Sequence, residues 1–223
     1  MDPLSLTFLI LYGVVSLTNI FFCIIRDEKW RKITKLFCMP MLMGFVLSIN
    51  YQNYWLWLSL LFAWIGDVLF IFKKKKLIAL IGMLFFLVAH VFYIFEFAHL
   101  FGRISPELLN SYFFFLYFAP LFLLPGIPVG LYLSKKDIKL TIAGSFYQSV
   151  LFLILGSSIF AIANNCSLYF IMIGMGAILY YVSDAFNAYT LYIKKLKMRE
   201  LIIMSSYLIA QFLIVFGIYL IAH

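Results

Sequence analysis

Residues 4–25 read LSLTFLILYGVVSLTNIFFCII, a run of apolar and small polar side chains without one charged group. At about 1.5 Å of rise per helical residue, the run can cross the roughly 30 Å hydrocarbon core of a bilayer. Backbone groups in lipid must bond within their own segment, and the run is too long for a barrel strand. The stretch therefore predicts a membrane-spanning helix.

Seven further apolar segments follow, and short connections separate them. They are residues 33–50, 54–72, 77–100, 110–133, 138–162, 167–193 and 200–222. The sequence thus predicts an all-α fold, a polytopic membrane helix bundle of about eight transmembrane helices that forms a single domain over residues 1–223. Segment 110–133 carries Pro120, Pro125 and Pro128, so we expect it to be bent, either to shape a cavity or simply to pack.

The composition of the whole chain has the same bias. Of its 223 residues, 65% are apolar, 20% aromatic and only 12% charged, with a mean hydropathy of +1.06. Ordinary soluble domains are about 45–50% apolar and about 25% charged. A soluble fold of this size could not bury 26 Phe and 15 Tyr together with the aliphatic residues. The composition excludes a soluble globular enzyme and a disordered chain.

The net charge of +8 is concentrated in alternate connections between the segments. Only Arg103 lies outside four groups: Arg26, Lys29, Arg31, Lys32 and Lys35; Lys73 to Lys76; Lys135, Lys136 and Lys139; Lys194, Lys195, Lys197 and Arg199. By the positive-inside rule these connections are cytoplasmic and both termini are non-cytoplasmic. In a bacterium this predicts a multi-pass protein of the inner membrane, with membrane lipid rather than nucleic acid as its surroundings.

Two of the nine carboxylates lie inside apolar segments. Asp67 lies in AWIGDVLF (63–70) and Asp184 in LYYVSDAFN (179–187), whereas the others, Glu96 among them, lie near segment ends or in loops. An ionised Asp at the bilayer centre costs roughly 2.5–3.5 kcal/mol, so such a residue is a functional candidate if it faces the bundle interior. The alternative is an Asp that only hydrogen-bonds to neighbouring helices.

Both acids are expected in the cytoplasmic half of the bundle or near its midplane. Asp67 and Asp184 precede the nearest lysine clusters by roughly 9 and 15 Å of helix, at about 1.5 Å per residue. Each follows a small residue, Gly66 or Ser183, and small residues permit close helix approach. We therefore expect the two carboxyl groups to face one cavity.

Other polar side chains occupy similar depths. They are His90 and Tyr93 on one face of their segment, Asn187 on the face of Asp184 three residues before it, and Tyr207 and Gln211 on one face of the last segment, with Asn19, Tyr147 and Gln148 at comparable levels. Each alone is typical of hydrogen bonding between helices. Together they predict a polar core.

The cysteines Cys23, Cys38 and Cys166 have no CxxC spacing, so no metal site is expected.

These motifs resemble the YhhN family of integral membrane proteins, which includes the lysoplasmalogenases. The matching motifs are Thr34-Lys35, Gly66-Asp67, Ala89-His90 with Tyr93, Ser183-Asp184, and Tyr207-Leu208 with Ala210-Gln211, in the family's order. Two positions depart from the pattern. Leu36 stands where the family has proline, and Ile209 separates Leu208 from Ala210.

The resemblance implies hydrolysis of the vinyl ether bond of lysoplasmenylethanolamine or lysoplasmenylcholine, a lysophospholipid substrate, to a fatty aldehyde and a glycerophospho-alcohol. No cofactor is expected. Vinyl ethers are cleaved by acid, so one carboxyl group must donate a proton and a second must stabilise the resulting cation and activate water. We assign Asp184 as the acid and Asp67 as the stabiliser and base, or the reverse. The remaining polar residues, His90, Tyr93, Asn187, Tyr207 and Gln211, would orient them or bind water.

Lys35 is the candidate for binding the substrate's phosphate. We expect it at the start of the second helix, where the positive end of the helix dipole also favours anions. The alternative is an ordinary positive-inside residue.

Two other functions of the protein stay open. Intramembrane acids also suit a proton-coupled transporter of small molecules or lipids, or a scaffold. A transporter needs access from both faces, and the bias of the polar residues towards the cytoplasmic side favours the enzyme.

Overall fold

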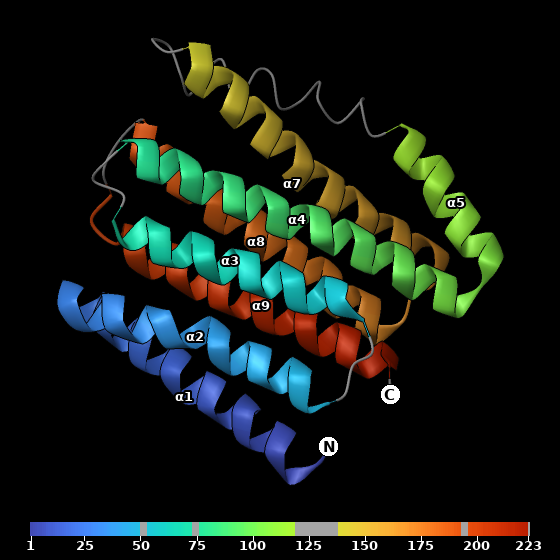
Figure 1. The fold of residues 1–223 in the computed structure, drawn as a ribbon, viewed down its shortest axis with the longest axis horizontal. Coiled ribbons are helices and arrows are strands. Elements are labelled where there is room, and N and C mark those ends of the chain that lie inside the picture. Colours follow the sequence, from blue (N-terminus) through green and yellow to red (C-terminus); the bar gives the residue numbers. More distant parts are fainter. Residues whose placement is uncertain (50–52, 73–75, 119–137, 193–195, 223) are drawn as a thin grey trace.

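The computed structural model describes residues 1–49, 53–72, 76–118, 138–192 and 196–222. In these ranges the chain forms eight helices and no strand, as the all-α prediction requires. With the labels of Figure 1, they are α1 (Pro3–Ile25), α2 (Glu28–Ser48), α3 (Tyr54–Ile71), α4 (Lys76–Ile104), α5 (Pro106–Tyr117), α7 (Ile138–Asn164), α8 (Leu168–Tyr192) and α9 (Arg199–Ala222).

Consecutive helices pair as antiparallel hairpins. Helix α1 packs along α2, α3 along α4, and α8 along α9, while α7 contacts both α4 and α8 (Figure 1). The N- and C-terminal ends of the described chain lie at the same end of the bundle, together with the connection between α7 and α8. The C-terminal ends of α1, α3 and α8 lie at the opposite end of the bundle. In the sequence, basic residues follow each of these three helices.

Six of these helices, α1, α3, α4, α7, α8 and α9, are long and apolar enough to cross a membrane. The chain is therefore an integral membrane helix bundle. Helix α2 is too polar and α5, with 12 residues, too short to belong to this group. The three prolines expected to bend segment 110–133 lie outside the described residues.

A polar capping residue, Asp27, marks the start of α2. The Asp27 carboxylate accepts hydrogen bonds from the backbone N–H groups of Lys29 and Trp30, and so caps α2. Helix α2 therefore begins at Glu28 rather than near residue 33, because its charged first turns extend beyond the apolar segment. Lys35 consequently lies two turns inside α2. The prediction that it stands at the positive end of a helix is wrong.

Glu96 is also placed differently from the prediction. Helix α4 continues to Ile104, so Glu96 lies within the helix instead of near a segment end, and only 1% of it is exposed. Its carboxylate accepts a hydrogen bond of 2.6 Å from the Asn53 side chain at the start of α3. The prediction placed Glu96 near a segment end because the apolar segment stops at residue 100, whereas the helix continues for four more residues. Glu96 links α3 to α4.

Close contact between α8 and α9 depends on glycine. A Cβ added to Gly176 would lie 2.9 Å from the backbone oxygen of Ala210, and one on Gly217 would lie 3.0 Å from the backbone oxygen of Tyr169. Real Cβ atoms essentially never approach so closely without a shift of their neighbours. The two glycines therefore permit the backbones of α8 and α9 to touch, which brings the polar side chains of α9 towards α3 and α4.

Candidate functional site

Asp67 of α3 contacts one residue from each of two other helices. The Lys35 ammonium of α2 lies 2.8 Å from Oδ1 of Asp67, and the Tyr207 hydroxyl of α9 donates to Oδ2 at 2.9 Å. Asp67 is 2% exposed, and the preceding Gly66 leaves room for the ring of Phe86. An adjacent ammonium favours the ionised form of a carboxyl group. Asp67 is thus a buried acid with a cation beside it.

Asp184 is held differently. The Tyr147 hydroxyl of α7 donates to Oδ2 of Asp184 at 2.5 Å. Among the described residues no cation forms an ion pair with Asp184. The preceding Ser183 donates to the backbone carbonyl of Ile203 on α9 at 3.0 Å, so the small residue does lie at a close helix contact, as expected. In the described ranges the partner of Asp184 is therefore a neutral hydroxyl, whereas Asp67 has an ammonium beside it.

A line of aromatic rings connects the two acids. The ring of Tyr207 meets Tyr180 edge to face at 5.5 Å, and Tyr180 meets His90 at 4.7 Å. The ring of His90 in turn lies 5.7 Å from that of Tyr147. The carboxyl groups of Asp67 and Asp184 make no direct hydrogen bond in the described part of the chain, so these ring contacts, with the hydroxyls of Tyr207 and Tyr147 on the acids, form the link between them. The acids therefore belong to one polar cluster.

Buried polar atoms in this cluster retain unused hydrogen-bonding capacity. His90 uses Nδ1 in a bond with the backbone oxygen of Phe86, whereas its Nε2 has no partner among the described residues. The hydroxyl of Tyr180 and Nε2 of Gln211 are likewise buried and unpaired within the described ranges. Buried polar groups usually bind protein or water. The cluster is thus equipped to hold a water molecule or a polar part of a ligand.

The pair Tyr93 and Gln211 forms a separate support. The Tyr93 hydroxyl of α4 donates to Oε1 of Gln211 on α9 at 2.5 Å, and both side chains are buried. This bond joins the α3–α4 hairpin to the α8–α9 hairpin. It also orients the amide of Gln211, whose Nε2 remains available.

A polar cavity of about 350 Å³ opens at the end of the bundle beside Lys35. Helices α2, α3, α8 and α9 form it, and it is lined by Glu28, Arg31, Lys32, Lys35, Phe70, Ile71, Asn187, Arg199, Glu200, Ile203 and Met204. The hydrogen bond and charge of Lys32 hold the pKa of the Glu28 carboxyl group below its usual value at this end, outside the six spans. Since Lys35 also touches Asp67, the cavity adjoins the acid cluster.

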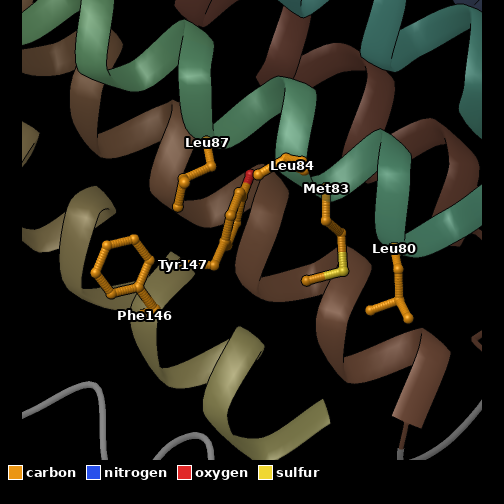
Figure 2. A pocket seen from close by; sticks show the side chains of 6 residues that line it. All are labelled: Leu80, Met83, Leu84, Leu87, Phe146 and Tyr147. Atoms are coloured by element: carbon orange, nitrogen blue, oxygen red, sulfur yellow. The ribbon is translucent and has the colours of Figure 1, made fainter. Parts of the chain in front are cut away.

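An apolar cavity of about 140 Å³ lies between α4 and α7. Figure 2 shows Leu80, Met83, Leu84 and Leu87 of α4 facing Phe146 and Tyr147 of α7. More than half of Leu84 and of Phe146 is exposed on the lipid-facing surface. The Tyr147 side chain is buried and extends away from the α7 backbone (Figure 2). Its hydroxyl is the donor to Asp184. The apolar cavity therefore adjoins the acid cluster through Tyr147.

The structure brings together most of the residues that the sequence singled out. Lys35, Asp67 and Tyr207 meet directly, His90 lies between the rings, and Tyr93 bonds to Gln211. Asn187 lines the polar cavity, and in the described part of the chain its side chain forms no hydrogen bond with either acid.

Sequence reasoning missed three roles. Tyr147 was noted only for its depth, without its bond to Asp184. Tyr180 was not singled out, although its position four residues before Asp184 places it on the same helix face. Arg31 and Arg199 were read only as topological cations and instead line the polar cavity. In the described ranges no three His, Cys, Asp or Glu residues form a group that could hold a metal ion.

A family model matches most of the chain. Residues 30–218 match the model of the YhhN family, and this range contains Lys35, Asp67, Asp184 and the other candidate residues. No curated protein and no solved structure matches the chain.

Proposed function

This chain belongs to the YhhN family, and from that premise we propose that it is a membrane hydrolase of the lysoplasmalogenase type. Its substrate is a lysoplasmalogen, and the bond it cleaves is the vinyl ether that links the alkenyl chain to glycerol. The products are a fatty aldehyde and a glycerophospho-alcohol such as glycerophosphoethanolamine or glycerophosphocholine.

The observation that carries the proposal is the position of the acids between two cavities of opposite character. Tyr147 lines the apolar cavity and donates to Asp184, while Lys35 lines the polar cavity and pairs with Asp67. In a lysoplasmalogen the vinyl ether lies between an apolar chain and a polar head. A chain in the α4–α7 cavity and a head group in the polar cavity would bring the vinyl ether to the acids.

The first chemical step needs a proton donor. Protonated Asp184 transfers its proton to the β-carbon of the vinyl ether, whose double bond supplies the electron pair, and an oxocarbenium ion forms at the neighbouring carbon. The Asp67 carboxylate, held by Lys35 and Tyr207, stabilises this cation electrostatically. The different surroundings of the two acids suit these different roles.

The second step needs water. A water molecule attacks the oxocarbenium carbon and gives a proton to Asp67, which produces a hemiacetal. The hemiacetal then breaks its carbon–oxygen bond to glycerol, and its hydroxyl proton passes to the departing oxygen. Return of a proton from Asp67 to Asp184 restores the starting state. The unpaired buried atoms of His90 and Tyr180 would position the water.

The test uses the purified full-length protein in detergent with lysoplasmenylethanolamine and an assay for free aldehyde. The wild type should release aldehyde, and Asp184→Asn should lower the rate by about 100-fold or more, the usual contribution of a general acid. The 1-O-alkyl analogue, which lacks the double bond, should not react. A transporter releases no aldehyde in detergent, so absence of aldehyde across pH values and detergents would contradict the proposal.

A further inference from the structure

The polar cavity contains a charged group that the proposed chemistry does not use. The Glu200 carboxylate accepts a hydrogen bond from the Arg31 guanidinium, with 2.8 Å between Nη1 and Oε2, and its Oε1 forms an ion pair with Nη2 of Arg199 at 2.7 Å. The exposed fractions of the three side chains are 13% for Arg31, 27% for Arg199 and 21% for Glu200. One acid thus orients two arginines that come from different helices, α2 and α9.

The charges of the cavity do not cancel. Four cations (Arg31, Lys32, Lys35 and Arg199) line it against two acids, Glu28 and Glu200, and Asp67 behind the wall is a third acid, so one positive charge is in excess. Lys32 is paired with Glu28, and Lys35 with Asp67 just behind the wall. The excess positive charge therefore resides on the two arginines that share Glu200. Each guanidinium has five N–H donors, so both retain donors beyond those that Glu200 accepts.

Lys35 is poorly suited to hold an anion in addition. Its ammonium lies 2.8 Å from an Asp67 carboxylate that is 2% exposed. A phosphate that drew Lys35 away would leave that carboxylate buried without its countercharge, which is costly. The phosphate contact expected for Lys35 from the sequence is better placed on the arginines. Arginine also matches the geometry of phosphate oxygens with two parallel N–H groups.

We propose that Arg31 and Arg199 bind the phosphodiester of the substrate's head group in this cavity, with Glu200 as the residue that positions them. The inference rests on the proposed function for the identity of the lipid. The cavity, at about 350 Å³, lies within the range of small-molecule sites. The arginines would hold the polar end of the lipid while the vinyl ether lies at the acids deeper in the bundle.

The decisive experiment compares two substrates of purified Arg31→Gln protein in detergent: lysoplasmenylcholine and 1-O-alkenylglycerol, which has the same vinyl ether but no phosphate. For the phosphate-bearing substrate we expect KM to rise about 10-fold or more, the effect of a lost charge-assisted hydrogen bond, with kcat little changed. For the alkenylglycerol no change in KM is expected. Lys29→Gln is the matched control, because Lys29 is an exposed cation of α2 that does not line the cavity.

Arg31 also links α2 to α9, so its replacement can disturb the fold. Equal losses of activity on both substrates would indicate such a structural role and overturn the proposal. Arg31→Lys retains the charge and should recover part of the affinity for lysoplasmenylcholine. An unchanged KM for that substrate in Arg31→Gln would also overturn the proposal.

A binding measurement separates this inference from the proposed function. Glycerophosphocholine is titrated into the wild type and Arg31→Gln by calorimetry, which requires no catalysis. Binding by the wild type that weakens about 10-fold or more in the variant supports the head-group site even if no aldehyde is ever released. No binding by the wild type overturns it. Binding of inorganic phosphate as tight as that of glycerophosphocholine also overturns it, because the site would then recognise any phosphate.

Discussion

Lys35 and Asp67 form an ion pair between neighbouring helices, with 2.8 Å between Nζ and Oδ1. The carboxylate is 2% exposed and the lysine side chain 16% exposed. The pair connects α2, which carries the polar cavity, to α3, which carries one of the two acids. In the proposed enzyme this pairing keeps Asp67 ionised and ready to face a developing cation.

Removing one partner of this pair should destabilise the bundle. Lys35→Met leaves the Asp67 carboxylate buried without its cation, and we expect a loss of about 3 kcal/mol in the free energy of unfolding. The double variant Lys35→Met/Asp67→Leu removes both charges and should recover most of that loss while remaining inactive. Unfolding followed in detergent gives both values. A Lys35→Met protein as stable as the wild type would contradict the role of the pair.

Tyr147 should matter for activity through its hydroxyl alone. Tyr147→Phe keeps the ring beside His90 and the wall of the apolar cavity but removes the 2.5 Å bond to Asp184. We expect aldehyde release to fall about 2- to 10-fold, the effect of losing one neutral hydrogen bond that holds the acid in position.

The matched control is Tyr112→Phe. Tyr112 is also buried and its hydroxyl is 2.9 Å from that of Ser157, but it lies between α5 and α7, where it contacts neither acid. Its replacement should leave the rate unchanged. Equal effects of the two substitutions on the rate would show that Tyr147 has no particular link to the chemistry.

The positions of these side chains were only partly predictable. The apolar segments indicated helices, and the cost of charge in lipid singled out Asp67 and Asp184. Which helices are neighbours, and how each is rotated about its axis, could not be read from segments that are apolar almost all around. Helix neighbours and helix rotation together determine whether Tyr147 can reach Asp184 and whether Arg31 and Arg199 can share Glu200. These contacts were therefore found only in the structure.

The close contact of α8 and α9 should be sensitive to a single methyl group. Gly176→Ala places a Cβ 2.9 Å from the backbone oxygen of Ala210, an atom that cannot move aside easily. We expect a loss of about 1–3 kcal/mol in the free energy of unfolding, as for other overpacked sites.

Gly13→Ala provides the comparison. Nothing lies within 4 Å of a Cβ at Gly13, which is also inside a helix. Alanine is the better helix former by about 1 kcal/mol, so this variant should be as stable as the wild type or slightly more stable. Thermal unfolding in detergent measures both variants. If Gly176→Ala unfolds no earlier than Gly13→Ala, the helices are not in backbone contact there.

The orientation in the membrane can be tested with a native cysteine. Cys166 is exposed and lies between α7 and α8, at the end of the bundle that holds the N- and C-terminal ends (Figure 1), whereas Cys23 and Cys38 are buried. The basic connections predict that this end is non-cytoplasmic. A membrane-impermeant maleimide should therefore label intact cells at Cys166, and Cys166→Ser should abolish the labelling. Labelling that requires permeabilised cells would reverse the orientation.

The most direct test of acid catalysis is kcat/KM for hydrolysis of lysoplasmenylethanolamine by the wild type in H₂O and in D₂O, each measured across pH. Proton transfer from Asp184 to carbon predicts a lower kcat/KM in D₂O at every pH, because a deuteron is transferred to carbon more slowly than a proton. Acid hydrolysis of the same lipid without enzyme provides the reference for this difference. Equal values in H₂O and D₂O would contradict proton transfer to carbon as the step that limits cleavage, and the assignment of the two acids would fail.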